Sequence, residues 1–265
     1  LTLTGTAANA IGNSINNTLT GNASANIIVG GAGNDAMVGG TGNDTYGVDS
    51  TLDVVTETAA SAGTDTIVSS VTYTLPAHVD NLTLGVLTVA SGSAVITSTA
   101  TTAISATGNS VGNTLLGNAG ANTIDGAEGN DIINGGAGKD KLIGGDGNDV
   151  FTFTFAIDSG ASAATTAALK SAADVISDYN VAGTDTINLD AINGTGGTPF
   201  TLHPTAALTS FAAFTANNQL QLVSEGADLV IYGNTDATFT TAEFAIVLTG
   251  YANNTLSLAS DILSI

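Results

Sequence analysis

Apolar residues return every nine residues along two stretches of the chain. In a nine-residue frame that begins at a glycine, the eighth position is apolar in every unit. These residues are Leu19, Ile28, Met37 and Tyr46 in the first stretch, and Leu115, Ile124, Ile133, Leu142 and Phe151 in the second. Successive side chains of a strand point to opposite faces, so one residue in each unit can face inward while its neighbours face outward. The pattern therefore predicts one short strand in every unit.

Glycine occupies the first position of each unit and often the second and fourth positions. Two units with this pattern read GGAGNDAMV from Gly30 to Val38 and GGDGNDVFT from Gly144 to Thr152. Glycine adopts positive φ and lets carbonyl groups approach closely, as a tight turn around an ion requires. One unit is then a turn and a strand, and two units make a coil. We therefore expect an all-β, right-handed parallel β-roll, or β-solenoid, in which like turns stack every 18 residues.

The sixth position of each unit carries a side-chain oxygen. It is aspartate at Asp35, Asp44, Asp131, Asp140 and Asp149, and asparagine at Asn17, Asn26, Asn113 and Asn122. The first-position glycines of the aspartate units are Gly30, Gly39, Gly126, Gly135 and Gly144. Carboxylate and carbonyl oxygens are the ligands that Ca²⁺ prefers, and stacked carboxylates without a cation would repel one another. These residues are our candidate metal ligands, and a metal-free glycine-rich solenoid is the alternative.

The three units around Asp131, Asp140 and Asp149 resemble the repeats-in-toxin (RTX) family, whose consensus is G-G-x-G-x-D-x-U-x. The resemblance implies that calcium sits between turns two units apart, held by backbone carbonyls and both sixth-position side chains. Asp131 with Asp149 would be the best pair. Four mixed pairs are implied as well: Asn122–Asp140, Asn113–Asp131, Asn26–Asp44 and Asn17–Asp35. Asparagine keeps an oxygen but loses a charge, so the mixed sites should be weaker or hold water.

The charge of the chain narrows its partners. Three basic residues against 23 acidic ones give a formal net charge of −20. Such a chain cannot neutralise phosphates, which argues against nucleic acid and anionic membranes as partners. The sequence has no run of about 20 apolar residues, so membrane insertion is not predicted. Cysteine is absent, so disulfides and thiolate metal sites are excluded.

The repeats divide the chain into four expected regions. Residues 1–47 form a first repeat block, 48–107 a β-rich spacer that continues the solenoid, 108–152 a second block, and 153–265 a C-terminal cap with a type I secretion-signal region. Extra residues near Val86 to Thr101 predict an additional coil or strand pair. The alternating Phe151, Phe153 and Phe155 are expected to plug the roll.

Further resemblances concern the spacer and the C-terminal region. The spacer resembles that of long modular RTX surface proteins, and the segments Asp174–Tyr179 and Gly183–Leu189 resemble the cap of serralysin proteases. The last residues, SLASDILSI, resemble a type I secretion tail, although Ser264 interrupts the usual apolar run.

A catalytic set is not apparent in the sequence. The HExxH zinc motif is missing. GNSVG, from Gly108 to Gly112, fits the G-x-S-x-G pattern of a nucleophile elbow, but it lies within the nine-residue frame. His78 and His203, the two histidines, are interpreted as loop residues. We therefore expect no enzymatic activity from this chain.

Two functions fit these features. The first is a calcium-dependent structural part of a secreted, extracellular or cell-surface bacterial protein of the S-layer or adhesin type. Its partners would be calcium, copies of itself in a lattice or a cell-surface polysaccharide, and the type I secretion machinery. The alternative is the secretion and folding module of an extracellular protease or lipase whose catalytic domain lies upstream of Leu1.

Overall fold

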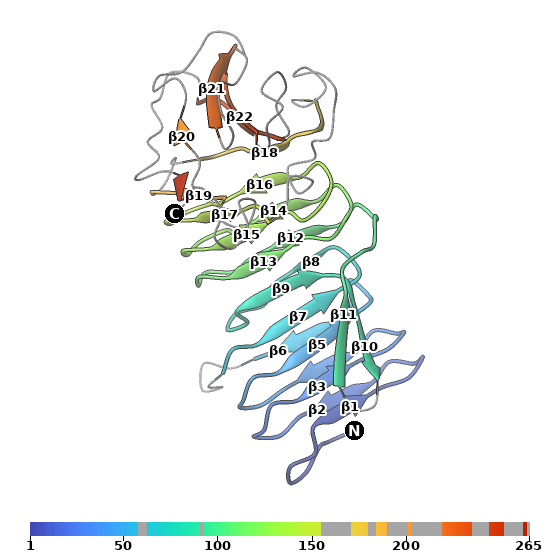
Figure 1. Ribbon diagram of the computed structural model, residues 1–265. Coiled ribbons are helices and arrows are strands. Elements are labelled where there is room, and N and C mark those ends of the chain that lie inside the picture. The colour runs from blue at the N-terminus through green and yellow to red at the C-terminus, as the bar shows by residue number, and fades with distance from the viewer. Residues whose placement is uncertain are drawn as a thin grey trace.

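The protein is a stack of parallel β-coils that rises from the N-terminus toward the C-terminal region (Figure 1). The computed structural model describes residues 1–57, 63–90, 93–154, 171–179, 184–189, 201–202, 219–234, 244–251 and 262–263. Nearly all regular structure within these ranges is β-strand. The expected all-β parallel solenoid is therefore confirmed.

One long sheet runs through the whole stack. Its strands, in spatial order, are β1 (Asn9–Ile11), β3 (Ile27–Val29), β5 (Thr45–Val48), β7 (Thr66–Ser69), β9 (Asn81–Leu84), β13 (Thr114–Leu116), β15 (Ile132–Asn134), β17 (Val150–Thr152), β19 (Thr186–Asn188) and β24 (Ile262–Leu263). All neighbours are parallel, and Ala10 of β1 lies opposite Ile28 of β3. Two nine-residue units therefore make one coil, as the frame predicts.

The alternate strands of the coils form two further sheets. The first contains β2 (Thr18–Thr20), β4 (Ala36–Val38) and β6 (Val54–Thr56). The second contains β8 (Tyr73–Thr74), β12 (Ser105–Thr107), β14 (Thr123–Asp125), β16 (Lys141–Ile143) and β18 (Asp174–Ile176), and then β23 (Phe244–Leu248), β22 (Asp228–Asn234), β21 (Gln219–Glu225) and β20 (Thr201–Leu202).

The core is a column of eighth-position side chains. All nine of them are at most 1% exposed, from Leu19 in the first block to Phe151 in the second. Apart from Gly47, their neighbours in the strands are exposed or half-buried, as in β13 and β16. Phe153 is also buried, whereas Phe155 lies outside the described residues. Each repeat thus contributes one large side chain to the interior.

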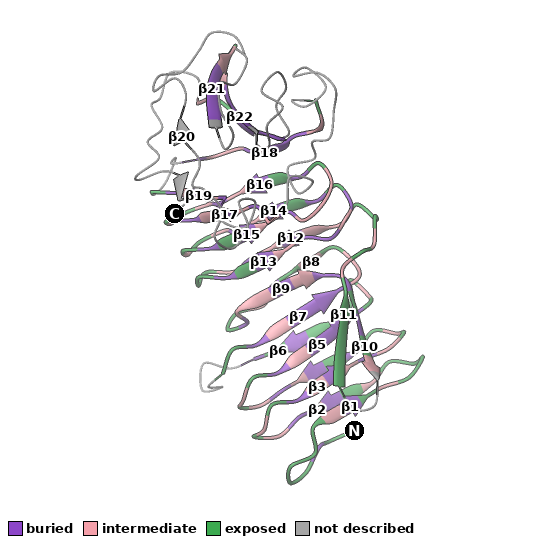
Figure 2. Cartoon of the chain, in the orientation of Figure 1, coloured by how far each residue is buried: buried purple, intermediate pink, exposed green. Residues whose placement is uncertain are grey.

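The additional residues of the spacer form a strand pair rather than a coil. β10 (Val86–Ala90) and β11 (Ser93–Thr97) are antiparallel, and β10 contacts β5 and β7. The hairpin lies beside the coils in Figure 1, and all five residues of β11 are exposed (Figure 2). The rest of the spacer, through β6 to β9, continues the solenoid.

The parallel ladder continues beyond Thr152, where the glycine frame ends. β18 pairs with β16, so Ile176 lies opposite Leu142, and β19 pairs with β17. The antiparallel strands β21 to β23 then extend the sheet beyond β18. The serralysin-like character of this region stays a prediction. No helix within the described ranges has the length and hydropathy to cross a membrane.

Candidate metal centre

The turns of the aspartate units use glycine in two different ways. At positions two and four the backbone has positive φ, for example 83° at Gly31 and 137° at Gly33, where other residues would be strained. At position one, glycine provides space. A Cβ added at Gly126 would collide with Oδ2 of Asp131 and with the carbonyl oxygen of Gly144 in the next coil.

The same arrangement recurs in the other aspartate units. An added Cβ at Gly30, Gly39, Gly135 or Gly144 would meet Oδ2 of the aspartate five residues later in the chain. These aspartates are Asp35, Asp44, Asp140 and Asp149. In every such turn, therefore, a carboxylate oxygen lies against a glycine, in the space that the Cβ of any other residue would occupy.

The sixth-position residues stack from coil to coil through hydrogen bonds. The backbone N–H of Asp131 donates to Oδ1 of Asp149 at 2.9 Å, and that of Asn113 donates to Oδ1 of Asp131 at 2.6 Å. The other three expected pairs, Asn122–Asp140, Asn26–Asp44 and Asn17–Asp35, make the same bond at 2.7 Å. The structure therefore brings together all five pairs.

The second carboxylate oxygen has a different environment. Oδ2 of Asp35, Asp44, Asp131 and Asp149 is buried and accepts no hydrogen bond from the residues that the structure describes. Burial raises the pKa of Asp131 to about 7, with the neighbouring carboxylate of Asp149 adding to the shift. Burial likewise raises the pKa values of Asp44 and Asp149 to about 6.

Calcium fits this arrangement. The buried Oδ2 atoms and the glycine carbonyls offer hard oxygen ligands, and Ca²⁺ takes six to eight such ligands in flexible geometry. A bound cation would also favour the ionised form of each buried aspartate. These potential ligands are all oxygen atoms, from carboxylate and backbone carbonyl groups. Oxygen ligands favour calcium over zinc or copper.

Turns with asparagine at the sixth position satisfy their own polar groups. Oδ1 of Asn122 accepts the N–H of Asn118 at 2.9 Å, and Nδ2 donates to the carbonyl oxygen of Ile104 at 2.8 Å. In the first block, Nδ2 of Asn26 donates to the carbonyl oxygen of Ala7 at 3.1 Å. An amide N–H thus engages a carbonyl oxygen of another coil. Weaker calcium binding at these turns stays a prediction, and the amide contacts supply a reason for it.

Sequence reasoning missed five stacked aspartates. The backbone N–H of Asp35 donates to Oδ1 of Asp53 at 2.9 Å, so Asp53 continues the first column. The others that accept such bonds in later coils are Asp65, Asp80, Asp174 and Asp185. Their units lack the glycine pairs, but each keeps an aspartate two residues before a buried apolar residue. That half of the motif is the signal that could have found them.

Two acidic residues and one histidine outside the stacked aspartates are exposed. Glu128 and Asp146, at the third position of their units, are exposed. His78 is exposed in a turn with φ of 69°, and His203 lies outside the described residues. GNSVG forms the turn between β12 and β13, without the helix that a nucleophile elbow needs.

Comparisons with known proteins agree with this motif. The family model of the RTX calcium-binding nonapeptide repeat, of four copies, matches residues 11–46, 107–142 and 116–151. The chain therefore carries RTX calcium-binding nonapeptide repeats in both blocks. No curated protein gives a significant match.

Two solved structures from Azotobacter vinelandii resemble the chain, and both are solution structures of subunits of a mannuronan C5-epimerase. The AlgE6R3 subunit is 27% identical with a TM-score of 0.41, covering 61% of this chain and 77% of that chain. The AlgE6R2 subunit is 26% identical with a TM-score of 0.39, covering 61% of this chain and 91% of that chain.

Proposed function

We propose that this chain is a calcium-ordered structural part of an exported bacterial surface protein of the S-layer or adhesin type. The observation that carries the proposal is the set of four buried aspartates, Asp35, Asp44, Asp131 and Asp149, whose Oδ2 atoms accept no hydrogen bond from the described residues. The only lysines are Lys139, Lys141 and Lys170, and arginine is absent. Side chains cannot neutralise such a column along its length, so calcium supplies the missing charge.

The ligands follow from the stacked pairs. Asp131 and Asp149, with the carbonyl oxygen of Gly144 beside Gly126, would hold one ion in the second block. Asp35 with Asp53 and Asp140 with Asp174 are joined by the same bond from a backbone N–H to Oδ1, although Oδ2 of Asp53 also accepts the N–H groups of Asp49 and Ser50. These assignments extend the repeat motif to coils in which only its second half is present.

We propose an extracellular location because of the calcium concentration that such modules require. Extracellular calcium modules bind with dissociation constants of about 10⁻⁴ to 10⁻³ M, far above cytosolic levels of the ion. A chain with this requirement stays unfolded during synthesis and export, and folds once outside. The partners we propose are the type I secretion machinery during export, and copies of the chain or a cell-surface polysaccharide afterwards.

Circular dichroism of the full chain tests this proposal. We expect a largely unfolded spectrum in EGTA and a β-sheet spectrum when calcium reaches the millimolar range. A full β-sheet spectrum in EGTA that calcium leaves unchanged would contradict the proposal. Titration with magnesium is the control, because Mg²⁺ requires near-octahedral geometry and keeps several waters.

A further inference from the structure

We propose that Asp44, Glu57 and Asp65 form a divalent-cation site that the nonapeptide motif does not contain. The three residues come from different segments at the junction of the first block and the spacer. Asp44 precedes β5, Glu57 follows β6, and Asp65 precedes β7. Only Asp44 lies within the segments that match the repeat family.

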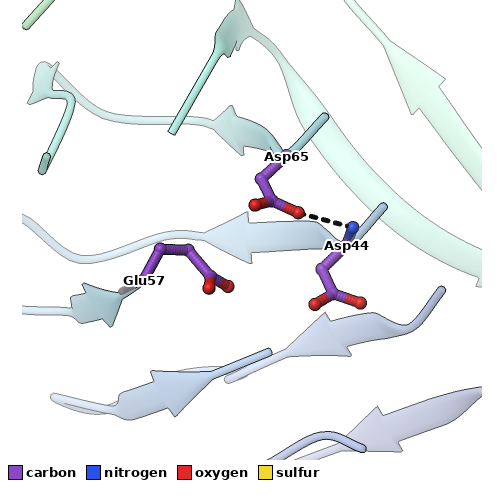
Figure 3. A group of neighbouring side chains, drawn as sticks. All are labelled: Asp44, Glu57 and Asp65. Atoms are coloured by element: carbon purple, nitrogen blue, oxygen red, sulfur yellow. Dashed lines mark hydrogen bonds between the residues drawn. The ribbon is translucent and has the colours of Figure 1, made fainter. Parts of the chain in front are cut away.

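The geometry brings the three carboxylates together. Each offers one oxygen, and these oxygens lie within 4.8 Å of one another. All three residues are buried, with exposed fractions of 1% for Asp44, 8% for Glu57 and 1% for Asp65. Figure 3 shows the carboxylate of Glu57 reaching toward Asp44, with Asp65 bonded to the backbone N–H of Asp44.

Glu57 is the feature that distinguishes this site from the repeat sites. β6 pairs with β4, with Val55 opposite Met37, so Glu57 follows Gly39 by one coil. The corresponding residue above Gly126 is Gly144, which contributes a carbonyl oxygen. Over Gly39, an added Cβ would instead meet Oδ2 of Asp44, the hydroxyl of Tyr46 and Oε1 of Glu57. The neutral carbonyl ligand is thus replaced by the charged carboxylate of Glu57, which the hydroxyl of Tyr46 contacts.

A second observation indicates a ligand at this place. Oδ2 of Asp44 is buried and accepts no hydrogen bond from the described part of the chain. The nearest lysine in the sequence is Lys139, and the chain has no arginine. The hydroxyl of Tyr46 contacts Oε1 of Glu57, which satisfies only one oxygen of the cluster. A divalent cation would neutralise two of the three charges.

Calcium suits the site better than magnesium. Ca²⁺ accepts mono- or bidentate carboxylates in irregular arrangements, whereas Mg²⁺ demands octahedral geometry and retains water. Three carboxylates give this site more ligand charge than a repeat site with two aspartates, and ligand charge raises calcium affinity. We expect the ion here to be the last one removed by a chelator from the first block.

The test is a count of calcium ions bound to the full chain by native mass spectrometry as a chelator lowers free calcium stepwise. Glu57→Gln keeps the shape but leaves only the two aspartate charges, so it should lose one ion at a higher free calcium concentration than the wild type. Glu128→Gln is the matched control, because Glu128 is exposed in the second block, and should bind the wild-type number at every step. An unchanged count at every step for a folded Glu57→Gln overturns the inference. A wild type that binds no calcium would instead refute the proposed function.

A second variant decides the case in which Glu57→Gln does not fold. Tyr46→Phe keeps all three carboxylates and the buried ring, so it should bind the wild-type number of ions. The chain has no tryptophan, so tyrosines sensitise the luminescence of bound Tb³⁺, and the Tyr46 hydroxyl contacts Glu57. Tyr46→Phe should therefore lower sensitised Tb³⁺ emission, while the control Tyr232→Phe should not. Emission unchanged by Tyr46→Phe overturns the proposal.

Discussion

Asp131 and Asp149 are joined through only one side of the carboxylate. Oδ1 of Asp149 accepts the backbone N–H of Asp131 at 2.9 Å, whereas Oδ2 of each residue is buried without a hydrogen bond from the described residues. The first oxygen therefore holds the coils in register, and the second is left for a ligand. We therefore predict that the stability of the fold depends on a cation that neutralises Oδ2.

The calcium-free chain should be more stable in mild acid than in base. Burial raises the pKa of Asp131 to about 7 and that of Asp149 to about 6, above the value of about 3.9 in unfolded chains. The folded state then binds more protons, so its stability falls as the pH rises from about 4 to 7. Circular dichroism in calcium-stripped buffer checks this, because the chain should be largely unfolded at pH 8 and its folded fraction should rise at pH 5. Asp131→Asn should weaken the pH dependence, and a calcium-free chain that is more stable at pH 8 would contradict the prediction.

Asp131→Asn should weaken the calcium response of the second block. Asp131 stacks between Asn113 and Asp149, so the substitution removes a charged ligand from two adjacent turns. We expect the calcium midpoint of folding to rise roughly tenfold, equivalent to about 1.4 kcal/mol. The control is Asp146→Asn at an exposed third position. Equal midpoints for the two variants would show that Asp131 is not a ligand.

Comparison with the first block sharpens this prediction. From the sequence, Asp35 is paired with Asn17 alone, and its loss should matter less than that of Asp131. The structure adds Asp53 on the other side of Asp35. Calorimetry of Asp35→Ala and Asp131→Ala should therefore show losses that are closer than the sequence implies, because both aspartates have an aspartate neighbour. A loss for Asp35→Ala confined to one weak site would favour the simpler pairing.

Ala127→Gly should stabilise the protein. Ala127 occupies position two of its unit with φ of 75°, a conformation that favours glycine. Relief of this strain should add about 1 kcal/mol to the free energy of unfolding, less the greater entropy of glycine in the unfolded chain. Gly136→Ala, at the same position of the next unit with φ of 83°, should have the opposite effect. Urea unfolding at saturating calcium measures both changes, and a destabilising Ala127→Gly would refute the argument.

Asn122→Asp should destabilise the fold at low calcium but strengthen calcium binding at this turn. The amide N–H of Asn122 bonds to the carbonyl oxygen of Ile104 at 2.8 Å, and an aspartate cannot donate that bond. The lost buried hydrogen bond should cost about 1–3 kcal/mol and lower the folded fraction at subsaturating calcium, whereas calcium should bind more tightly at this turn. Paired urea and calcium titrations measure the two effects. No gain in calcium binding would mean that the asparagine turns lack the other ligands.

Residues 180–265 should be needed for export. The final residues resemble a type I secretion tail, so deletion of this segment in a native host should retain the chain inside the cell. Fusion of the segment to an unrelated soluble passenger is the control, and should direct that passenger out. Normal amounts of the truncated chain in the medium would place the signal elsewhere.

The sequence predicted those parts of the fold that repeat. Leu115 and Phe151 are buried because a fixed interval places every eighth-position residue on the inner face of a strand, and local spacing suffices to find them. The path of β10 and β11 beside the coils depends on contacts with β5 and β7, which no local pattern encodes. β18 pairs with β16 across an insertion, so the nine-residue frame does not predict the pairing of Ile176 with Leu142 either.

The repeated part of the candidate site could also be predicted from the sequence. Asp131 and Asp149 are recognised by the glycines around them. Glu57 does not, because it stands where the frame requires glycine and its role depends on Gly39 in the preceding coil. Asp65 follows Asp44 by 21 residues instead of 18, so an insertion takes it out of the frame. Only the stacking of coils in the folded chain brings Glu57 and Asp65 beside Asp44.

The hydrogen bonds between sixth-position residues all run in one direction along the stack. The earlier residue donates its backbone N–H and the later one accepts through its carboxylate, from Asn26–Asp44 in the first block to Asp149–Asp185 near the C-terminal region. The column is therefore polar, and its two ends are chemically unlike. A second ladder can continue this one only if its coils run in the same direction, head to tail. Contacts of that kind do not form a two-fold pair, and they lead to closed rings or open filaments.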